Sequence, residues 1–133
     1  MFDKLNNLRN NSYAPYSNFK VSAILITKDD IEFNGVNVEN ASYWATICAE
    51  RSAFVSAISA GYKKCDFKEL HILTSSNKIC TCCIICRQVI TEFCDKDMPV
   101  YCYSIAGDVK KFTVSELCPY PFDEGDLKWK VDL

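Results

Sequence analysis

The segments Cys48-Ala49-Glu50 and Cys83-Ile84-Ile85-Cys86 place three thiols and a carboxylate in two short parts of the chain. Three cysteine ligands leave a tetrahedral zinc ion with one open position, which is typical of a catalytic rather than a structural site. A glutamate two residues after the first cysteine can lie beside the open position and move protons. The pattern predicts one Zn²⁺ per chain, held by Cys48, Cys83 and Cys86, with Glu50 as the catalytic residue.

Both ligand segments are expected at helix N-termini. The sequence predicts an alanine-rich helix over 48–60, ended by Gly61 as a left-handed cap, and a second helix over 84–93. Free N–H groups and the positive end of the helix dipole stabilise thiolates there. Three thiolates on Zn²⁺ still leave one net negative charge. Arg51, one turn after Cys48, is expected to offset part of it by donating to a thiolate, the alternative being a surface ion pair.

The rest of the chain alternates short strands and helices. Mixed elements of this kind predict an α/β fold in which helices cover a sheet. The 133 residues show no internal repeat or linker, so one domain is expected over 1–133. The other predicted elements are a helix over 2–10, a hairpin of strands 19–27 and 31–36 around the turn 28–30, strands over 69–74, 99–104 and 109–114, and then a short helical turn and an irregular tail.

Composition and charge limit the class of protein. A net charge of −2 and a pI of about 5.4 provide no broad basic field for a polyanion, so no nucleic-acid partner is expected. No apolar run is long enough for a membrane span, and the polar N-terminus lacks the apolar stretch of a secretion signal. Nine cysteines, an odd number, favour a reduced cytoplasmic protein with a thiolate metal site over a disulfide framework.

The six cysteines outside the predicted ligand set fall into two groups. Cys80 and Cys82 lie next to the ligand pair. Three interpretations stay open for them: competition as zinc ligands, oxidation to a disulfide, or no role. The others are expected to be small buried hydrophobic residues, namely Cys65, Cys94, Cys102 and Cys118. His71, the single histidine, lies in an apolar strand and is interpreted as a hydrogen-bonded core residue rather than a ligand.

Four segments together resemble a known family. The chain reads Tyr-Ala-Pro-Tyr-Ser-Asn-Phe-Lys-Val from Tyr13, Gly-Val-Asn-Val-Glu-Asn-Ala-Ser-Tyr from Gly35, Cys-Ala-Glu-Arg-Ser-Ala from Cys48 and Cys-Arg-Gln from Cys86. In this order and spacing it resembles the small homotetrameric zinc cytidine deaminases of pyrimidine salvage, from about Tyr13 to Phe122. Zinc nucleobase deaminases combine such ligands with a non-ligand glutamate.

The resemblance implies a three-layer α/β/α fold with a five-stranded mixed sheet. It implies hydrolytic deamination of cytidine and deoxycytidine to uridine and deoxyuridine by a homotetramer with shared sites. In this reading Glu50 relays protons from water to the pyrimidine and to the departing amine. The other expected substrate-binding groups are the Ala49 N–H on the 2-oxygen, Asn37 and Glu39 on the ribose, Phe19 in the nucleoside pocket, and Tyr43 and Phe122 at a neighbour's site.

Some residues are interpreted on simpler grounds. Strand alternation places the Asn37 and Glu39 side chains together and turns Val38 toward the core. Arg87 and Gln88 match the family's Cys-Arg-Gln but are interpreted as helix surface without a catalytic role.

The second ligand segment departs from the family's Pro-Cys-Gly-x-Cys. Cys82 replaces the proline, which adds an N–H donor and loosens the loop, and Ile84 replaces the glycine. A β-branched residue disfavours positive φ, so the turn must suit it.

Three alternatives stay open at this stage. A polynucleotide deaminase shares the metal site but needs a basic groove and stacking aromatics. A non-catalytic zinc module closed by a fourth thiol such as Cys82 leaves Glu50 unexplained. A related deaminase acting on another aminopyrimidine or a nucleoside antibiotic is the third.

Overall fold

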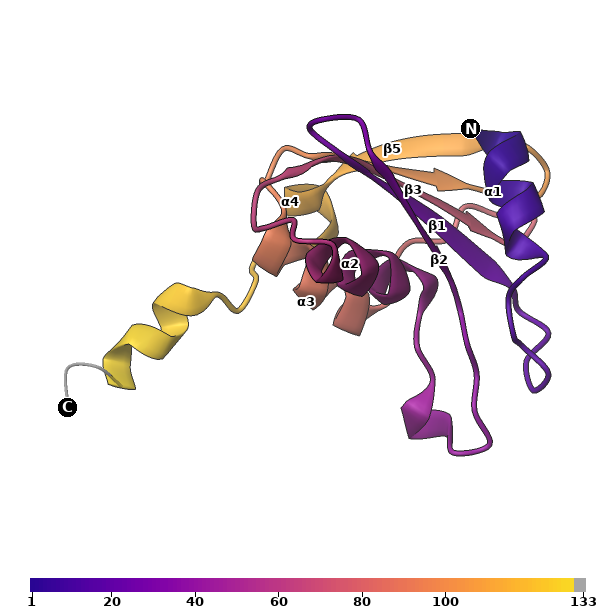
Figure 1. Ribbon diagram of the computed structural model, residues 1–133, viewed down its shortest axis with the longest axis horizontal. Coiled ribbons are helices and arrows are strands. Elements are labelled where there is room, and N and C mark those ends of the chain that lie inside the picture. The colour runs from indigo at the N-terminus through magenta and orange to yellow at the C-terminus, as the bar shows by residue number, and fades with distance from the viewer. Residues whose placement is uncertain (131–133) are drawn as a thin grey trace.

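A computed structural model describes residues 1–130 and shows a twisted sheet between helices (Figure 1). The order of elements is the predicted one, and the helix predicted over 84–93 has those bounds. In chain order the elements are α1 (Phe2–Arg9), β1 (Val21–Thr27), β2 (Glu32–Val36), η1 (Tyr43–Ala45), α2 (Ala49–Ser59), β3 (Phe67–Thr74), α3 (Ile84–Phe93), β4 (Pro99–Tyr103), β5 (Val109–Thr113), α4 (Val114–Leu117) and η2 (Glu124–Lys130).

The five strands form one mixed sheet in the order β2-β1-β3-β4-β5. The β3–β4 pair is parallel and the other three pairs are antiparallel. Alternate residues of the central strands face opposite cores: Leu70 and Ile72 lie with α2, α3 and α4, whereas Leu73 lies with Leu5 of α1. The three-layer α/β/α architecture with a five-stranded mixed sheet is therefore confirmed.

Helix α2 approaches β2 without intervening side chains. Ala49, Ala53 and Ala57 recur at four-residue intervals along α2 and are fully buried. Opposite them, a Cβ added to Gly35 of β2 would lie 2.1 Å from the Ala49 carbonyl oxygen and 2.6 Å from the Ala53 nitrogen. Only glycine permits this contact, which fixes where α2 begins.

The topology brings the two helix starts together. Strands β2 and β3 both run antiparallel to β1, so they point the same way. Helix α2 follows β2 and helix α3 follows β3, so both helices begin beyond the carboxyl ends of their strands. Sites in α/β proteins form at this edge of the sheet.

Three local expectations need correction. The first strand begins at Val21, not at 19, because the backbone groups of Phe19 and Lys20 bond to the side chains of Asn37 and Ser75 rather than to a neighbouring strand. Strand β3 begins at Phe67 rather than 69. The tail is not wholly irregular: η2 is a 3₁₀ helix that projects away from the sheet (Figure 1). Gly61 has the predicted left-handed conformation, with φ 101°. Within residues 1–130, no helix has the length and apolar character needed to cross a membrane.

Candidate active site

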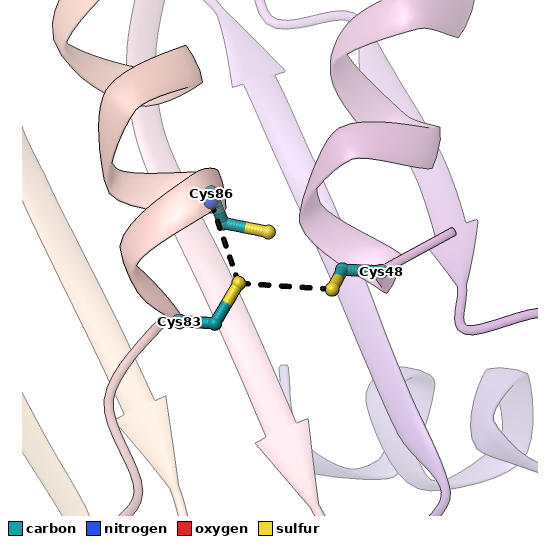
Figure 2. A group of neighbouring side chains, drawn as sticks. All are labelled: Cys48, Cys83 and Cys86. Atoms are coloured by element: carbon teal, nitrogen blue, oxygen red, sulfur yellow. Dashed lines mark hydrogen bonds between the residues drawn. The ribbon is translucent and has the colours of Figure 1, made fainter. Parts of the chain in front are cut away.

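Three thiols converge between the starts of α2 and α3 (Figure 2). Cys48 is the N-cap of α2, Cys83 is the N-cap of α3, and Cys86 lies in the first turn of α3. Their sulfur atoms all lie within 4.8 Å of one another, and the Cys48 and Cys83 sulfurs are 3.8 Å apart. A tetrahedral zinc with Zn–S bonds of about 2.3 Å needs sulfurs about 3.8 Å apart. The three residues therefore fit one zinc ion per chain.

The surroundings of the Cys48 sulfur favour its thiolate form, and the Cys83 sulfur also accepts a hydrogen bond. The Cys83 sulfur accepts a hydrogen bond from the Cys86 backbone N–H at 3.4 Å. The Arg51 guanidinium donates to the Cys48 sulfur, also at 3.4 Å. A hydrogen bond from the Cys86 thiol, aided by Arg51 and Cys83, lowers the pKa of Cys48 to about 5 despite its partial burial. The same contact raises the pKa of Cys86, as expected when two thiols share a proton in the absence of metal.

Glu50 is placed inside the protein beside these sulfurs. It lies in the first turn of α2 and is only 5% exposed. Burial is the main cause that raises the pKa of its carboxyl group, with the negative charge of Cys48 adding to it. Among the side chains described, those of residues 1–127, no lysine or arginine nitrogen forms an ion pair with this carboxylate. An unpaired buried carboxylate next to metal ligands is suited to taking up and releasing protons.

The departures from the usual ligand segment are accommodated locally. The start of α3 needs no positive φ, since Cys83 has φ −64° and Ile84 is helical, so the missing glycine has no conformational cost. Cys82 is a buried core residue, and burial raises the pKa of its thiol. Neither Cys80 nor Cys82 belongs to the group of thiols that converge, so a fourth cysteine does not close the site.

Asn37 and Glu39 both bind the loop that precedes β1. The Asn37 side chain accepts from the Val21 N–H at 2.8 Å and donates to the Phe19 carbonyl at 2.7 Å. One Glu39 oxygen accepts from the Tyr16 and Ser17 N–H groups at 3.0 and 3.1 Å, and the other accepts from the Ser17 hydroxyl. The Ser17 hydroxyl is the main cause that lowers the pKa of Glu39. Both side chains still have hydrogen-bonding capacity left.

Asn37 and Glu39 both point to the loop before β1, as the expected alternation of side chains requires, but Val38 does not point into the core. Asn37 is buried, whereas Val38 is 43% exposed rather than turned to the core, because it pairs with Tyr13 and Ile47 in isolated bridges outside the sheet. A cavity of about 300 Å³ adjoins this region, lined by Tyr16, Ser17, Glu39, Asn40, Tyr43 and Thr46.

The aromatic residues predicted to bind substrate lie at the surface. Phe19 and Phe122 are partly exposed, and Tyr43 in η1 is 74% exposed, with its ring edge-to-face against Tyr16. Phe122 lies in the segment that leads to η2, where its carbonyl accepts a hydrogen bond from Gln88 of α3. Trp44, which the sequence analysis did not single out, is 99% exposed beside Tyr43.

Several side chains outside the site differ from expectation. Cys94 and Cys102 are buried as predicted, but Cys65 is exposed in the turn before β3, and Cys118 is only half-buried. His71 is buried in β3, and its Nδ1 lies 3.0 Å from the Tyr103 hydroxyl. Its Nε2 lies 3.4 Å from a carboxylate oxygen of Glu69, a contact that lacks ideal hydrogen-bond geometry, so both ring nitrogens face a polar group.

Comparisons with known proteins agree with this geometry. Residues 1–102 match the family model described as the cytidine and deoxycytidylate deaminase zinc-binding region. The chain belongs to this deaminase family. It is 40% identical to a cytidine deaminase from Sporosarcina psychrophila, over 93% of this chain and 90% of that protein. A probable cytidine deaminase from Dictyostelium discoideum is 37% identical, over 98% and 86%.

Solved cytidine deaminases have the same fold. The crystal structure of cytidine deaminase from Burkholderia pseudomallei superposes with a TM-score of 0.87 at 39% identity, over 90% of this chain and 94% of that one. The prediction of a zinc-dependent cytidine deaminase is thereby confirmed, with a Cys48, Cys83 and Cys86 metal site.

Sequence reasoning missed two features that position the site. Gly35 determines how closely α2 approaches the sheet, and the signal was a glycine inside a strand pattern. Arg87 connects three backbone and side-chain groups around the second ligand segment, but a charged residue on a helix carries no sequence signal for such contacts.

Proposed function

We propose that this chain hydrolyses cytidine and deoxycytidine to uridine and deoxyuridine, releasing ammonia. The observation that supports this proposal best is the buried carboxylate of Glu50 beside three thiols that fit one zinc ion. When bound, zinc lowers the pKa of a water molecule and orients that water for attack. The water oxygen forms a bond to C4 of the pyrimidine, and the bond from C4 to the exocyclic nitrogen breaks.

Glu50 is assigned the proton transfers in this reaction. Its carboxylate takes a proton from the attacking water and delivers it to N3 of the ring. It then moves the second proton to the departing amine, so that ammonia leaves and the 4-oxo product forms. Because Glu50 is buried and has no ion-pair partner among the described residues, its proton is not locked into a salt bridge.

The remaining predicted residues are assigned to substrate binding. The Ala49 N–H, in the first turn of α2, is proposed to donate to the pyrimidine 2-oxygen. Asn37 and Glu39 would bind the ribose hydroxyls with their remaining capacity, and Phe19 would line the pocket. Arg51 is a positioning residue that donates to Cys48 and offsets the negative charge of the three thiolates.

The active form is proposed to be a cytoplasmic homotetramer of single-domain chains that serves pyrimidine salvage. Support for shared sites comes from the exposed aromatic residues: Tyr43, Trp44 and Phe122 have little cover within one chain. Large exposed aromatic side chains beside a cavity are typical of an interface. Phe122 would then complete the pocket of a neighbouring subunit.

A direct assay tests the substrate. Purified zinc-loaded protein is incubated with cytidine, deoxycytidine or single-stranded DNA, and loss of the amino chromophore and release of ammonia are followed. The proposal requires turnover of the free nucleosides and none of the cytosines in DNA. Turnover of DNA alone would support the polynucleotide alternative, and no turnover of any substrate would contradict an enzymatic role.

A further inference from the structure

Two consecutive residues of α3 connect the zinc-ligand segment to the C-terminal segment. Arg87 donates to the Cys82 carbonyl at 2.8 Å, just before the ligand Cys83, and to the Leu117 carbonyl at the end of α4 at 2.7 Å. Gln88 donates through Nε2 to the Phe122 carbonyl at 2.7 Å. The same helical turn therefore contacts the backbone at two points along the C-terminal segment.

The Gln88 contact falls where the chain has little other support. Residues 118–123 form no helix or strand between α4 and η2, and Tyr120 and Phe122 are exposed. Within residues 1–130, the Gln88 hydrogen bond is the one that joins residues 119–123 to the part of the chain before α4. The nearest other polar contact is the exposed ion pair between Lys64 and Glu124 at 3.7 Å, at the start of η2. Without the Gln88 hydrogen bond, residues 119–123 would be held mainly at their ends and would gain the conformational freedom of an exposed loop.

Gln88 lies two residues after the ligand Cys86, on the exposed side of α3. A donor there holds the Phe122 backbone at a fixed place relative to the metal ligands, and thereby limits where the Phe122 ring can reach. We propose that Gln88 is a positioning residue for Phe122, which presents the Phe122 ring to the pyrimidine in a neighbouring subunit's site. This inference rests on the proposed role of Phe122.

The test uses the full-length, zinc-loaded protein and compares Gln88→Met with Gln88→Lys. Met matches the length of Gln and suits a helix but cannot donate, whereas Lys donates through its ammonium group. Gln88→Met should raise KM for cytidine about threefold to tenfold, the range that one net hydrogen bond supplies, with kcat and zinc content unchanged. Gln88→Lys should have the same KM as the unchanged protein. Glu92→Met, one turn further along the exposed surface of α3, is the matched control and should leave KM unchanged.

A double-mutant cycle separates positioning from a general structural effect. If Gln88 acts through the Phe122 ring, Gln88→Met should have no further effect on KM once Phe122→Ala is present. An equal rise in KM in both backgrounds would overturn the proposal. A second result would also overturn it: a normal KM in Gln88→Met together with a raised KM in Phe122→Ala. In that case Phe122 would keep its proposed role, and only the role of Gln88 would be lost. If Phe122→Ala itself leaves KM unchanged, the role of Phe122 and this inference both fail.

Discussion

Glu50 and the three thiols lie where two helix starts pack against the sheet, whereas Tyr43, Trp44 and Phe122 stand on the outside of the chain. The first group sits on two helix starts that are fixed by the sheet and by the close contact at Gly35. The second group lies in η1 and in the segment before η2, with Trp44 99% exposed. We call the first group the interior half of the site, although Cys83 itself is exposed, and the second group the exposed half.

Because of this difference, substitutions in the two regions should have different effects. Changes in the interior half should alter metal binding, proton transfer or folding, because its members are packed together. Changes in the exposed half should alter substrate affinity and leave the metal and the folded chain unchanged. The two regions are separable if variants in each half change only the properties of that half.

Cys83→Ala should remove the metal and with it all measurable activity. Two remaining thiols cannot hold zinc at the affinity of a three-ligand site. The zinc content of the purified protein should fall from one ion per chain to a small fraction of that value. Cys80→Ala is the matched control, because this thiol lies near the ligand segment but outside the converging group, and it should keep its zinc. Full zinc retention in Cys83→Ala would falsify the ligand assignment.

Glu50→Gln should keep the zinc and the fold but lose nearly all turnover. An amide cannot carry protons, and general acid–base catalysis contributes about 10²–10⁴-fold. Because Glu50 is proposed to act at more than one step, the loss in kcat should reach or exceed the top of this range. Glu92→Gln, on the exposed surface of α3, serves as the control and should leave kcat unchanged. Near-normal turnover in Glu50→Gln would mean that another group carries the proton.

Gly35→Ala should destabilise the fold by about 1–3 kcal/mol or more, the cost of forcing atoms into a packed interior. The added methyl group would meet backbone atoms of Ala49 and Ala53, which cannot rotate away, so α2 must shift. Thermal unfolding of the zinc-free protein measures the effect. Gly107→Asn is the comparison, since nothing lies within 4 Å of an added Cβ there and Asn tolerates positive φ. An equal loss of stability in both variants would contradict the close-contact explanation.

Phe122→Ala should raise KM for cytidine without loss of zinc or of the folded chain. An aromatic ring stacked on a base contributes about 1–3 kcal/mol by alanine substitution, so the increase should be about 5- to 150-fold. Steady-state kinetics with metal analysis of the same samples provides the measurement.

Mixing variants then tests whether the site is shared. When Phe122→Ala chains exchange subunits with an excess of Glu50→Gln chains, hybrid sites combine an intact Glu50 with a neighbour's intact Phe122. Their KM should return to normal. A fully active monomer in light scattering, or no rescue despite verified exchange, would count against shared sites.

The sequence predicted local features better than tertiary contacts. Helix α3 was predicted with its bounds because its apolar residues recur at helical spacing and Cys83 caps it. The start of β1 was misplaced because the side chains that bond to the Phe19 and Lys20 backbone, Asn37 and Ser75, are distant in sequence. Cys65 was wrongly taken as buried because its residue type favours burial, whereas the structure places it in an exposed turn.

In the candidate site too, local features were predictable and tertiary contacts were not. Ligand types and spacing indicated zinc, but the sequence alone did not show that β2 and β3 point the same way and so bring Cys48 next to Cys83. Likewise, the bonds from Ser17 to Glu39 and from Gln88 to Phe122 join residues 22 and 34 positions apart, which no local pattern predicts.

X-ray absorption at the zinc edge of the purified protein tests the central claim most directly, because it counts the ligands of the metal. If the interior half serves catalysis, the zinc should have three sulfur ligands at about 2.3 Å and one oxygen or nitrogen ligand at about 2.0 Å. The light ligand would be a water molecule beside Glu50. Four sulfurs would contradict this account, since a fourth thiol would close the site and leave Glu50 without a substrate.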